Sequence, residues 1–136
     1  MLITGILNPQ INSLLARVRH TNTLVIADRA FPFWPMIETV DVSLVDGIPT
    51  VLQVFQAVRS NFEIGEIWMA QEFVTANPAD VCEAFANAAI AVPLHYEAHL
   101  DLKRRVPGAI GLIRTGDAIQ YANMILISGP VEPGPG

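Results

Sequence analysis

The sequence predicts an α/β domain in which helices cover both faces of a mostly parallel sheet. Three observations lead to this prediction. Helix-like and strand-like segments alternate along the chain. The strand-like run 23–27 (TLVIA) is apolar throughout, as in strands that are covered on both faces, and 136 residues suit one domain with a sizeable core. We therefore expect a single three-layer domain over residues 1–136.

Local signals define the elements of the first half of the chain. Asn8 can cap a helix with Pro9 at its first position, and apolar residues at helical spacing extend this helix to about residue 19. The strand 23–27 is followed by a proline-rich loop over 29–35 and, we expect, by a second strand over 40–44. Asp46-Gly47 then indicates a turn, and Pro49 can open the helix that completes this half.

The second half repeats this alternation. The run 66–70 (EIWMA) indicates a strand, and Asn77-Pro78 repeats the cap and proline that open the first helix. A strand over 89–96 contains Pro93, which favours a position at the edge of the sheet, and a short helix is expected over 99–105. Two strands are expected within 109–116 and 123–129, and the closing segment 129–136 is expected to fray.

Composition indicates a globular protein with surplus apolar surface. Hydrophobic residues make up 51% of the chain, charged residues make up 15%, and the mean hydropathy is +0.40, which is too apolar for a disordered chain. No uninterrupted apolar stretch reaches the roughly 18 residues of a membrane span. Because a monomer of this size would leave apolar patches in water, we expect a homo-oligomer.

Charge and cysteine content narrow the expected partners and compartment. The net charge is −5, and the one basic cluster, 103–105, is short and lacks interleaved aromatic residues, so we expect no nucleic-acid partner. The N-terminal segment has no basic region and reaches Pro9 early, unlike a signal peptide. The single cysteine, Cys82, excludes an internal disulfide, which suits a cytoplasmic protein.

Two polar residues flank the apolar strand 23–27. His20 ends the first helix, where an imidazolium interacts well with the helix dipole, and precedes the turn into the strand. Asp28 follows the strand, and ligand sites in parallel sheets form beyond the carboxyl ends of the strands. Because five extended residues span about 17 Å, His20 and Asp28 can share a cavity only if neighbouring elements or another subunit bring them together.

Metal and nucleophile chemistry have little support in the sequence. His95 and His99 stand four residues apart, but Pro93 argues against a helix at His95, and no other ligand repeats with zinc-type spacing, so we expect no metal site. Cys82 lies in a helix-like segment and is expected to be a structural thiol. Neither nucleotide-binding loop pattern is present, so we expect no such cofactor. The chemistry that the sequence still supports is general acid–base catalysis by histidine, carboxylate or tyrosine.

The segment 114–128 (RTGDAIQYANMILIS) carries the last polar cluster. Tyr121 and Asn123 precede the final strand, and alone they indicate a tyrosine at the rim of the core and an asparagine in a turn. Together with an imidazole and a carboxylate, they form a set of donors and acceptors that suits a polyhydroxylated ligand.

Three segments resemble one known family, the D-ribose pyranases and L-fucose mutarotases (RbsD/FucU). They are 8–32 (NPQINSLLARVRHTNTLVIADRAFP), 46–54 (DGIPTVLQV) and 113–126 (IRTGDAIQYANMIL), and the similarity covers nearly the whole chain. The resemblance implies a small cytoplasmic α/β protein that forms a ring-shaped oligomer, typically a decamer of two stacked pentamers, with sites between subunits. The implied reaction interconverts cyclic forms of a monosaccharide, which is an isomerase activity that needs no cofactor.

The resemblance also implies roles for individual residues. The general acid of the family matches His20, and its sugar-binding aspartate matches Asp28. Its second histidine matches His99, which lies at the corresponding distance before the tyrosine. The remaining sugar-binding stretch of the family matches three consecutive residues, Tyr121, Ala122 and Asn123.

Three positions near these residues depart from the family pattern. Arg19 and Asn22 flank His20 in the turn where the family usually has glycine and aspartate. The carboxylate that this aspartate would place beside His20 is therefore absent. Arg29 replaces a small residue after Asp28, and its guanidinium can alter sugar preference or face another subunit.

The sequence does not decide which sugar is the substrate, and it is compatible with two other classes of function. The segment 46–54 and the YAN triplet are ribose-like, whereas Phe31 is fucose-like. A sugar-binding or transport-associated module without catalysis would keep the same pocket, and a purely structural ring protein would explain the apolar excess alone. Trp34 and Trp68 could stack on a sugar, but packing in the core or at an interface is the simpler interpretation.

Overall fold

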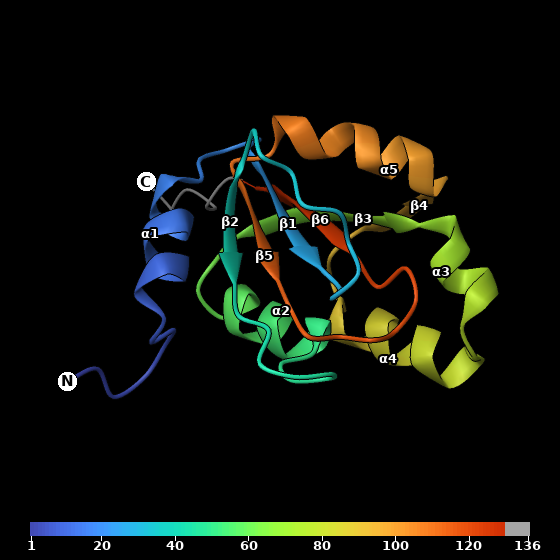
Figure 1. Ribbon diagram of the computed structural model, residues 1–136, viewed down its shortest axis with the longest axis horizontal. Helices are drawn as coiled ribbons and strands as arrows, with labels where there is room; N and C mark the ends of the chain where they lie inside the picture. Colours follow the sequence, from blue (N-terminus) through green and yellow to red (C-terminus); the bar gives the residue numbers. More distant parts are fainter. Residues whose placement is uncertain (130–136) are drawn as a thin grey trace, which may run out of the picture.

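A computed structural model describes residues 1–129, and a single six-stranded sheet lies at its centre (Figure 1). The strands lie side by side in the order β2-β5-β1-β6-β3-β4. Their bounds are β1 Thr23–Ala27, β2 Glu38–Asp41, β3 Ile64–Ala70, β4 Leu94–Glu97, β5 Gly111–Arg114 and β6 Met124–Ser128. Only β6 runs antiparallel to its neighbours, β1 and β3. Five strands therefore share one direction, and the predicted mostly parallel sheet is confirmed.

Helices cover both faces of this sheet and complete three layers (Figure 1). Their bounds are α1 Pro9–Arg17, α2 Val51–Arg59, α3 Gln71–Ala76, α4 Ala79–Ala88 and α5 His99–Arg105, followed by a 3₁₀ turn at Val106–Gly108. Leu24 and Ile26 of β1 pack in the layer of α1, α2 and α4, whereas Val25 and Ala27 pack in the layer of α5. The strand is apolar on both faces because both faces are covered.

The first two helices begin close to their predicted positions. The Asn8 side chain accepts a backbone N–H of the first turn at 2.9 Å, and Pro9 is the first residue of α1, as predicted. The second helix, α2, begins at Val51 rather than at Pro49. The reason is that Thr50 caps the helix through a capping box, which satisfies backbone N–H groups that Pro49 could not.

The second Asn-Pro signal has a different role in the structure. Asn77 does not cap α4, because its side-chain amide donates to the carbonyl oxygens of Phe73 at 2.8 Å and Gln120 at 2.9 Å. Directly before it lies α3, a helix of six residues that the sequence analysis did not predict. Asn77 thus connects the end of α3 to the loop that precedes β6.

The five parallel strands end on one side of the sheet, here termed its carboxyl end. Asp28 follows β1 there, the loop 115–123 follows β5, and α3 and α5 come after β3 and β4. The strand β6 begins on the same side because it runs in the opposite direction. The carboxyl end therefore gathers four separate parts of the chain, as is typical of binding sites in α/β sheets.

Within residues 1–129, none of the helices has the length and apolar character that crossing a membrane requires. The segment 130–136, which belongs to the closing stretch expected to fray, lies outside the described residues.

Candidate active site

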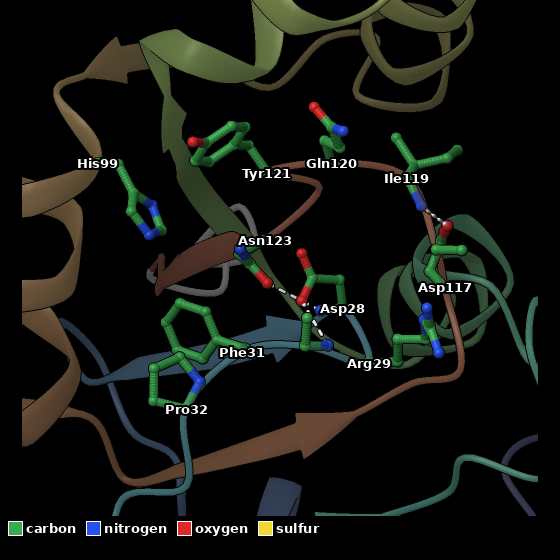
Figure 2. Close-up of a pocket in the computed structure, with 12 residues that line it drawn as sticks. Asp28, Arg29, Phe31, Pro32, His99, Asp117, Ile119, Gln120, Tyr121 and Asn123 are labelled. Carbon is green, nitrogen blue, oxygen red and sulfur yellow. Dashed lines mark hydrogen bonds between the residues drawn. The ribbon is translucent and has the colours of Figure 1, made fainter.

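A cavity of about 490 Å³ opens at the carboxyl end of the sheet (Figure 2). Its walls come from the loop after β1, from the start of α5 and from the loop between β5 and β6. The lining residues are Asp28, Arg29, Ala30, Phe31, Pro32, His99, Asp117, Ala118, Ile119, Gln120, Tyr121 and Asn123. Four of the six residues predicted for the site, namely Asp28, His99, Tyr121 and Asn123, therefore meet in one cavity.

Asp28 is one of two buried carboxylates in the wall of this cavity, the other being Asp117, and it is only 7% exposed. Its backbone N–H donates to Oδ1 of Asn123 at 2.7 Å, and its Oδ1 accepts the Ala30 N–H at 3.0 Å (Figure 2). Burial raises the pKa of the Asp28 carboxyl, and the nearby carboxylate of Asp117 adds to this rise. The backbone amides of Ala30 and Phe31 act in the opposite direction because they donate hydrogen bonds to the ionised form.

His99 is held in the cavity by the first turn of α5. Ala98 precedes the helix and has no side-chain acceptor, so the carboxylate of Glu72 on α3 takes the place of a cap. Both carboxylate oxygens of Glu72 lie 3.1 Å from the backbone nitrogen of His99 and accept its N–H. The imidazole lies edge-on to the Tyr121 ring at 5.1 Å and to the Phe31 ring at 6.3 Å between centroids.

The surroundings of His99 favour the neutral form of its imidazole. Burial is the main cause that lowers its pKa below the ordinary value of 6.5, and the cation of Lys103 adds to the effect. The carboxylates of Glu72 and Asp28 oppose it. Within residues 1–129 the buried Nδ1 of His99 has no hydrogen-bond partner. A neutral imidazole can donate a proton from one nitrogen and accept one at the other.

Asp117, which the sequence analysis did not single out, organises the loop between β5 and β6. It is 3% exposed, and its carboxylate accepts the N–H of Val51 at 2.9 Å. The carboxylate also accepts the N–H of Ile119 at 2.9 Å (Figure 2). Its carbonyl oxygen accepts the Arg29 N–H at 3.0 Å. Asp117 thereby connects the cavity wall to the first turn of α2 and to the loop after β1.

The same loop packs against the turn at 45–48. Gly47 N–H donates to the Gly116 carbonyl oxygen at 2.6 Å, and Gly47 has a φ of +79°, which confirms the predicted turn there. A Cβ at Gly116 would clash with the Val45 carbonyl oxygen and would lie 2.6 Å from that of Ile48. Glycine is therefore required at position 116 for this close approach.

The three consecutive residues 121–123 have different positions. Tyr121 has a φ of +56°, a left-handed conformation that is uncommon for residues other than glycine, and its ring faces His99 (Figure 2). Asn123 is almost fully buried and contacts Asp28. Ala122, side chain and backbone alike, is fully buried in the core, and it is not among the residues that line the cavity.

His20 does not lie in the cavity of its own chain. It is exposed in the turn before β1, whereas Asp28 follows the other end of the same strand, and a strand of this length spans about 17 Å. Asn22 closes this turn, since its Oδ1 accepts the Arg19 N–H at 2.9 Å. Thr21, directly after His20, has a φ of +70°.

Arg29 lines the cavity at its exposed margin. Its guanidinium pairs with Asp46 at 2.9 Å, and both side chains are more than half exposed. An exposed pair of this kind adds little to stability, so it leaves Arg29 able to exchange Asp46 for another partner. The structure therefore allows both roles that the sequence analysis considered for this guanidinium.

Other candidates from the sequence lie away from the cavity. The His95 ring stacks on the Trp68 ring with 4.7 Å between the ring centroids. The guanidinium carbon of Arg105 lies 4.2 Å from the centroid of the same Trp68 ring. Trp34 packs near Phe31 at 6.3 Å. Packing therefore accounts for both tryptophans. Within residues 1–129, no three histidine, cysteine, aspartate or glutamate side chains are grouped as metal ligands.

The chain is similar in sequence to known D-ribose pyranases. It is 42% identical to the D-ribose pyranase of Geobacillus thermodenitrificans over 92% of this chain and 94% of that protein. It is 37% identical to the D-ribose pyranase of Halalkalibacterium halodurans over 93% of this chain and 96% of that protein.

Solved structures agree with these sequence relatives. Bacillus subtilis RbsD complexed with D-ribose superposes with a TM-score of 0.88 and 28% identity, over 96% of this chain and 99% of that one. The fucose mutarotase of Streptococcus pneumoniae, in complex with L-fucose, shares the fold with a TM-score of 0.73 and 18% identity over 91% and 94% of the two chains. The profile of the RbsD / FucU transport protein family matches residues 1–131. The chain therefore belongs to the RbsD / FucU family.

Proposed function

We propose that this protein is an isomerase that interconverts the cyclic forms of a monosaccharide, with D-ribose as its substrate. The observation that carries the proposal is the cavity in which a buried carboxylate, an imidazole, a phenol and an amide converge. The D-ribose pyranases that are 37–42% identical over almost the whole chain support the same activity and favour ribose over fucose.

The reaction needs only proton transfer and a change of ring. The anomeric hydroxyl loses its proton, the bond between the anomeric carbon and the ring oxygen breaks, and the ring oxygen takes its electron pair and a proton. The open aldehyde then closes on its other face or through another hydroxyl. This sequence involves no net oxidation and no group transfer.

The residues of the cavity supply the binding and part of the proton transfer. The Asp28 carboxylate accepts hydrogen bonds from sugar hydroxyls, and Asn123 holds Asp28 in place while its amide remains close to the ligand. The neutral His99 imidazole accepts the proton of the anomeric hydroxyl or returns it, and Tyr121 provides a further hydroxyl. Ala122 lies between Tyr121 and Asn123 in the stretch that the proposal assigns to sugar binding, and its place there is in the core. One well-placed acid or base typically contributes about 10²–10⁴-fold.

His20 is the general acid in this proposal, and it acts in the cavity of a neighbouring subunit. Its exposed position at the opposite end of β1 supports this arrangement, because it leaves the imidazole accessible to another chain. The proposal includes a ring-shaped homo-oligomer of ten subunits. Large apolar side chains that are exposed in one chain support association into an oligomer, and they include Phe33, Met36, Leu44, Val45 and Ile48.

The proposal includes a cytoplasmic location and no nucleic-acid or membrane partner. The single Cys82, which is unpaired, agrees with a reducing compartment. The basic end of α5 is already partly neutralised, because Arg104 pairs with Asp101 at 3.0 Å and Arg105 pairs with Glu97. These pairs leave little free positive charge for a phosphate backbone.

Exchange NMR on an equilibrated sugar tests the proposal. Cross-peaks between the pyranose and furanose forms of D-ribose, and between their anomers, should grow faster with the protein than in buffer. L-Fucose serves as the comparison sugar. Replacing His20 with alanine should slow the exchange by about 10²–10⁴-fold. Binding of ribose without faster exchange would contradict the catalytic proposal and indicate a sugar-binding module, whereas failure to bind either sugar would indicate a structural role.

A further inference from the structure

Arg114, the last residue of β5, holds the loop that carries Asp28. Its side chain is 12% exposed. Its Nη1 donates to the carbonyl oxygens of Asp28 at 3.4 Å, Arg29 at 3.3 Å and Phe31 at 2.6 Å, and its Nη2 donates to that of Pro32 at 3.3 Å. The guanidinium thus binds four carbonyl groups of one short loop.

One of these carbonyls belongs to the peptide group between residues 29 and 30. The oxygen of this peptide accepts from Arg114, and its N–H, which is that of Ala30, donates to Oδ1 of Asp28 at 3.0 Å. The guanidinium, the peptide and the carboxylate are therefore connected in series. A cation at the oxygen fixes the orientation of the peptide and polarises its N–H, which strengthens the bond to the carboxylate.

We propose that Arg114 is a positioning residue for Asp28, acting through the peptide between residues 29 and 30 to hold the carboxylate in the orientation that accepts sugar hydroxyls. The part of this inference that concerns sugar binding rests on the proposed function. The part that concerns the Asp28 carboxylate does not, and it can be measured without any sugar.

The substitution Arg114→Lys separates geometry from charge. Lysine keeps the positive charge but cannot reach four carbonyls, because it lacks the planar fork of five N–H donors. The other charged or titratable groups around Asp28 stay in place; they are Asp117, His99, Arg29 and Tyr121. A change in the Asp28 titration therefore reports the loss of the oriented peptide.

Arg59 offers a matched control within the same chain. Its guanidinium also binds backbone carbonyls, those of Ala88 at the end of α4 and of Ile90 just after it, and it is not part of the cavity wall. Arg59→Lys removes the same kind of bonds at a remote loop. It should affect stability but leave the Asp28 carboxylate and the cavity unchanged.

The experiment is a ¹³C NMR titration of the Asp28 carboxyl group, assigned with Asp28→Asn, together with calorimetric binding of D-ribose. In Arg114→Lys the pKa of Asp28 should be higher than in the wild type, because the amide bond that favours ionisation is weakened. Ribose affinity should fall about tenfold. Arg59→Lys should match the wild type in both measurements.

An unchanged titration in Arg114→Lys, or an equal shift in Arg59→Lys, would overturn the inference. A shifted titration in a protein that never binds ribose would support the role of Arg114 and contradict the proposed function, so the two failures can be distinguished. If Arg114→Lys does not fold, an NMR titration of the wild-type protein tests the inference instead. The Ala30 amide and Arg114 guanidinium protons should both shift as Asp28 ionises, and an Arg114 signal that stays constant would contradict the series connection.

Discussion

Asp28 is a residue at which binding and stability oppose each other. Burial raises the pKa of its carboxyl in the folded protein, so the folded chain binds this proton more tightly than the unfolded chain, in which the pKa is near 3.8. The resulting stabilisation is fully present below about pH 3.8 and is lost as the pH rises through the folded pKa. Above that pKa the ionised Asp28 therefore destabilises the fold, although it is the form that the proposed function uses as an acceptor for the sugar.

Replacing Asp28 with asparagine should therefore improve stability and abolish function. The variant should have a higher Tm than the wild type at pH 7. The difference should shrink as the pH falls through the folded pKa and should be smallest below about pH 3.8, where the wild-type carboxyl is also neutral. Ribose affinity should fall about 10–100-fold because hydrogen bonds to a charged acceptor are lost. Thermal unfolding at both pH values and calorimetry measure these effects.

The control for this prediction is Asp80→Asn. Asp80 is an exposed carboxylate in the first turn of α4, where a negative charge is favourable, so its replacement should bring no gain in Tm. A wild type that is more stable than Asp28→Asn at pH 7 would show that the buried carboxylate stabilises the protein.

At the scale of elements, α3 and α5 meet through the contact between Glu72 and His99. The Glu72 carboxylate accepts the first N–H of α5 and raises the pKa of His99 against the larger effect of burial. Since the pKa of His99 is lowered overall, its contribution to stability is present above about pH 6.5 and is lost as the pH falls through the folded pKa.

The substitution Glu72→Gln should lower the pKa of His99 further, because a negative charge that favours the imidazolium is removed. It should also destabilise the protein by about 0.3–1 kcal/mol through the weaker start of α5. Imidazole resonances followed by NMR against pH measure the first effect, and urea unfolding measures the second. Glu83→Gln, at an exposed position of α4, should leave the His99 titration unchanged; a His99 pKa that rises or stays constant in Glu72→Gln would contradict the prediction.

The contact between the 115–123 loop and the 45–48 turn gives a second prediction at this scale. Gly116→Ala should destabilise the protein by about 1–3 kcal/mol, because the added methyl group would force apart two backbones that already touch. Gly108→Ala is the matched control, since a Cβ there would meet no atom within 4 Å. Chemical denaturation compares the two midpoints. Equal midpoints would show that the loop and the turn separate at little cost.

Elements with local signals were predicted well, and elements set by distant contacts were not. Asn8 and Pro9 mark the start of α1 because cap and helix are neighbours in sequence. Asn77 carries the same signal, yet its amide bonds to Phe73 and to Gln120, which is 43 residues away. The antiparallel direction of β6 likewise depends on where the loop before it crosses the sheet, and no local pattern encodes that.

The residues of the site also divide into those that the sequence could predict and those that it could not. Asp28 and His99 present polar side chains to the cavity, so residue type and resemblance identified them in advance. Asp117, Glu72 and Arg114 act instead on backbone groups of distant segments. Only the folded chain shows which N–H or carbonyl lies within their reach, so the roles of these three residues could not be predicted from the sequence, even though Arg114 and Asp117 lie in a segment that resembles the family.

At the scale of the whole molecule, one chain has a cavity at the carboxyl end of the sheet and the predicted general acid, His20, at the other end. These halves can form one site only in an oligomer in which His20 of one subunit reaches the cavity of the next. The exposed apolar side chains of the single chain agree with such an assembly. The central claim is therefore that each active site is shared between two subunits.

Mixed oligomers test this claim most directly. His20→Ala and Asp28→Asn subunits, each carrying a different tag, would be produced together, and oligomers that contain both would be assayed by exchange NMR on D-ribose. Each variant alone should be inactive, whereas the mixture should regain about a quarter of the wild-type rate, because random assembly pairs an intact His20 with an intact Asp28 at about one site in four. Mixed oligomers that remain as inactive as the separate variants would contradict the shared site.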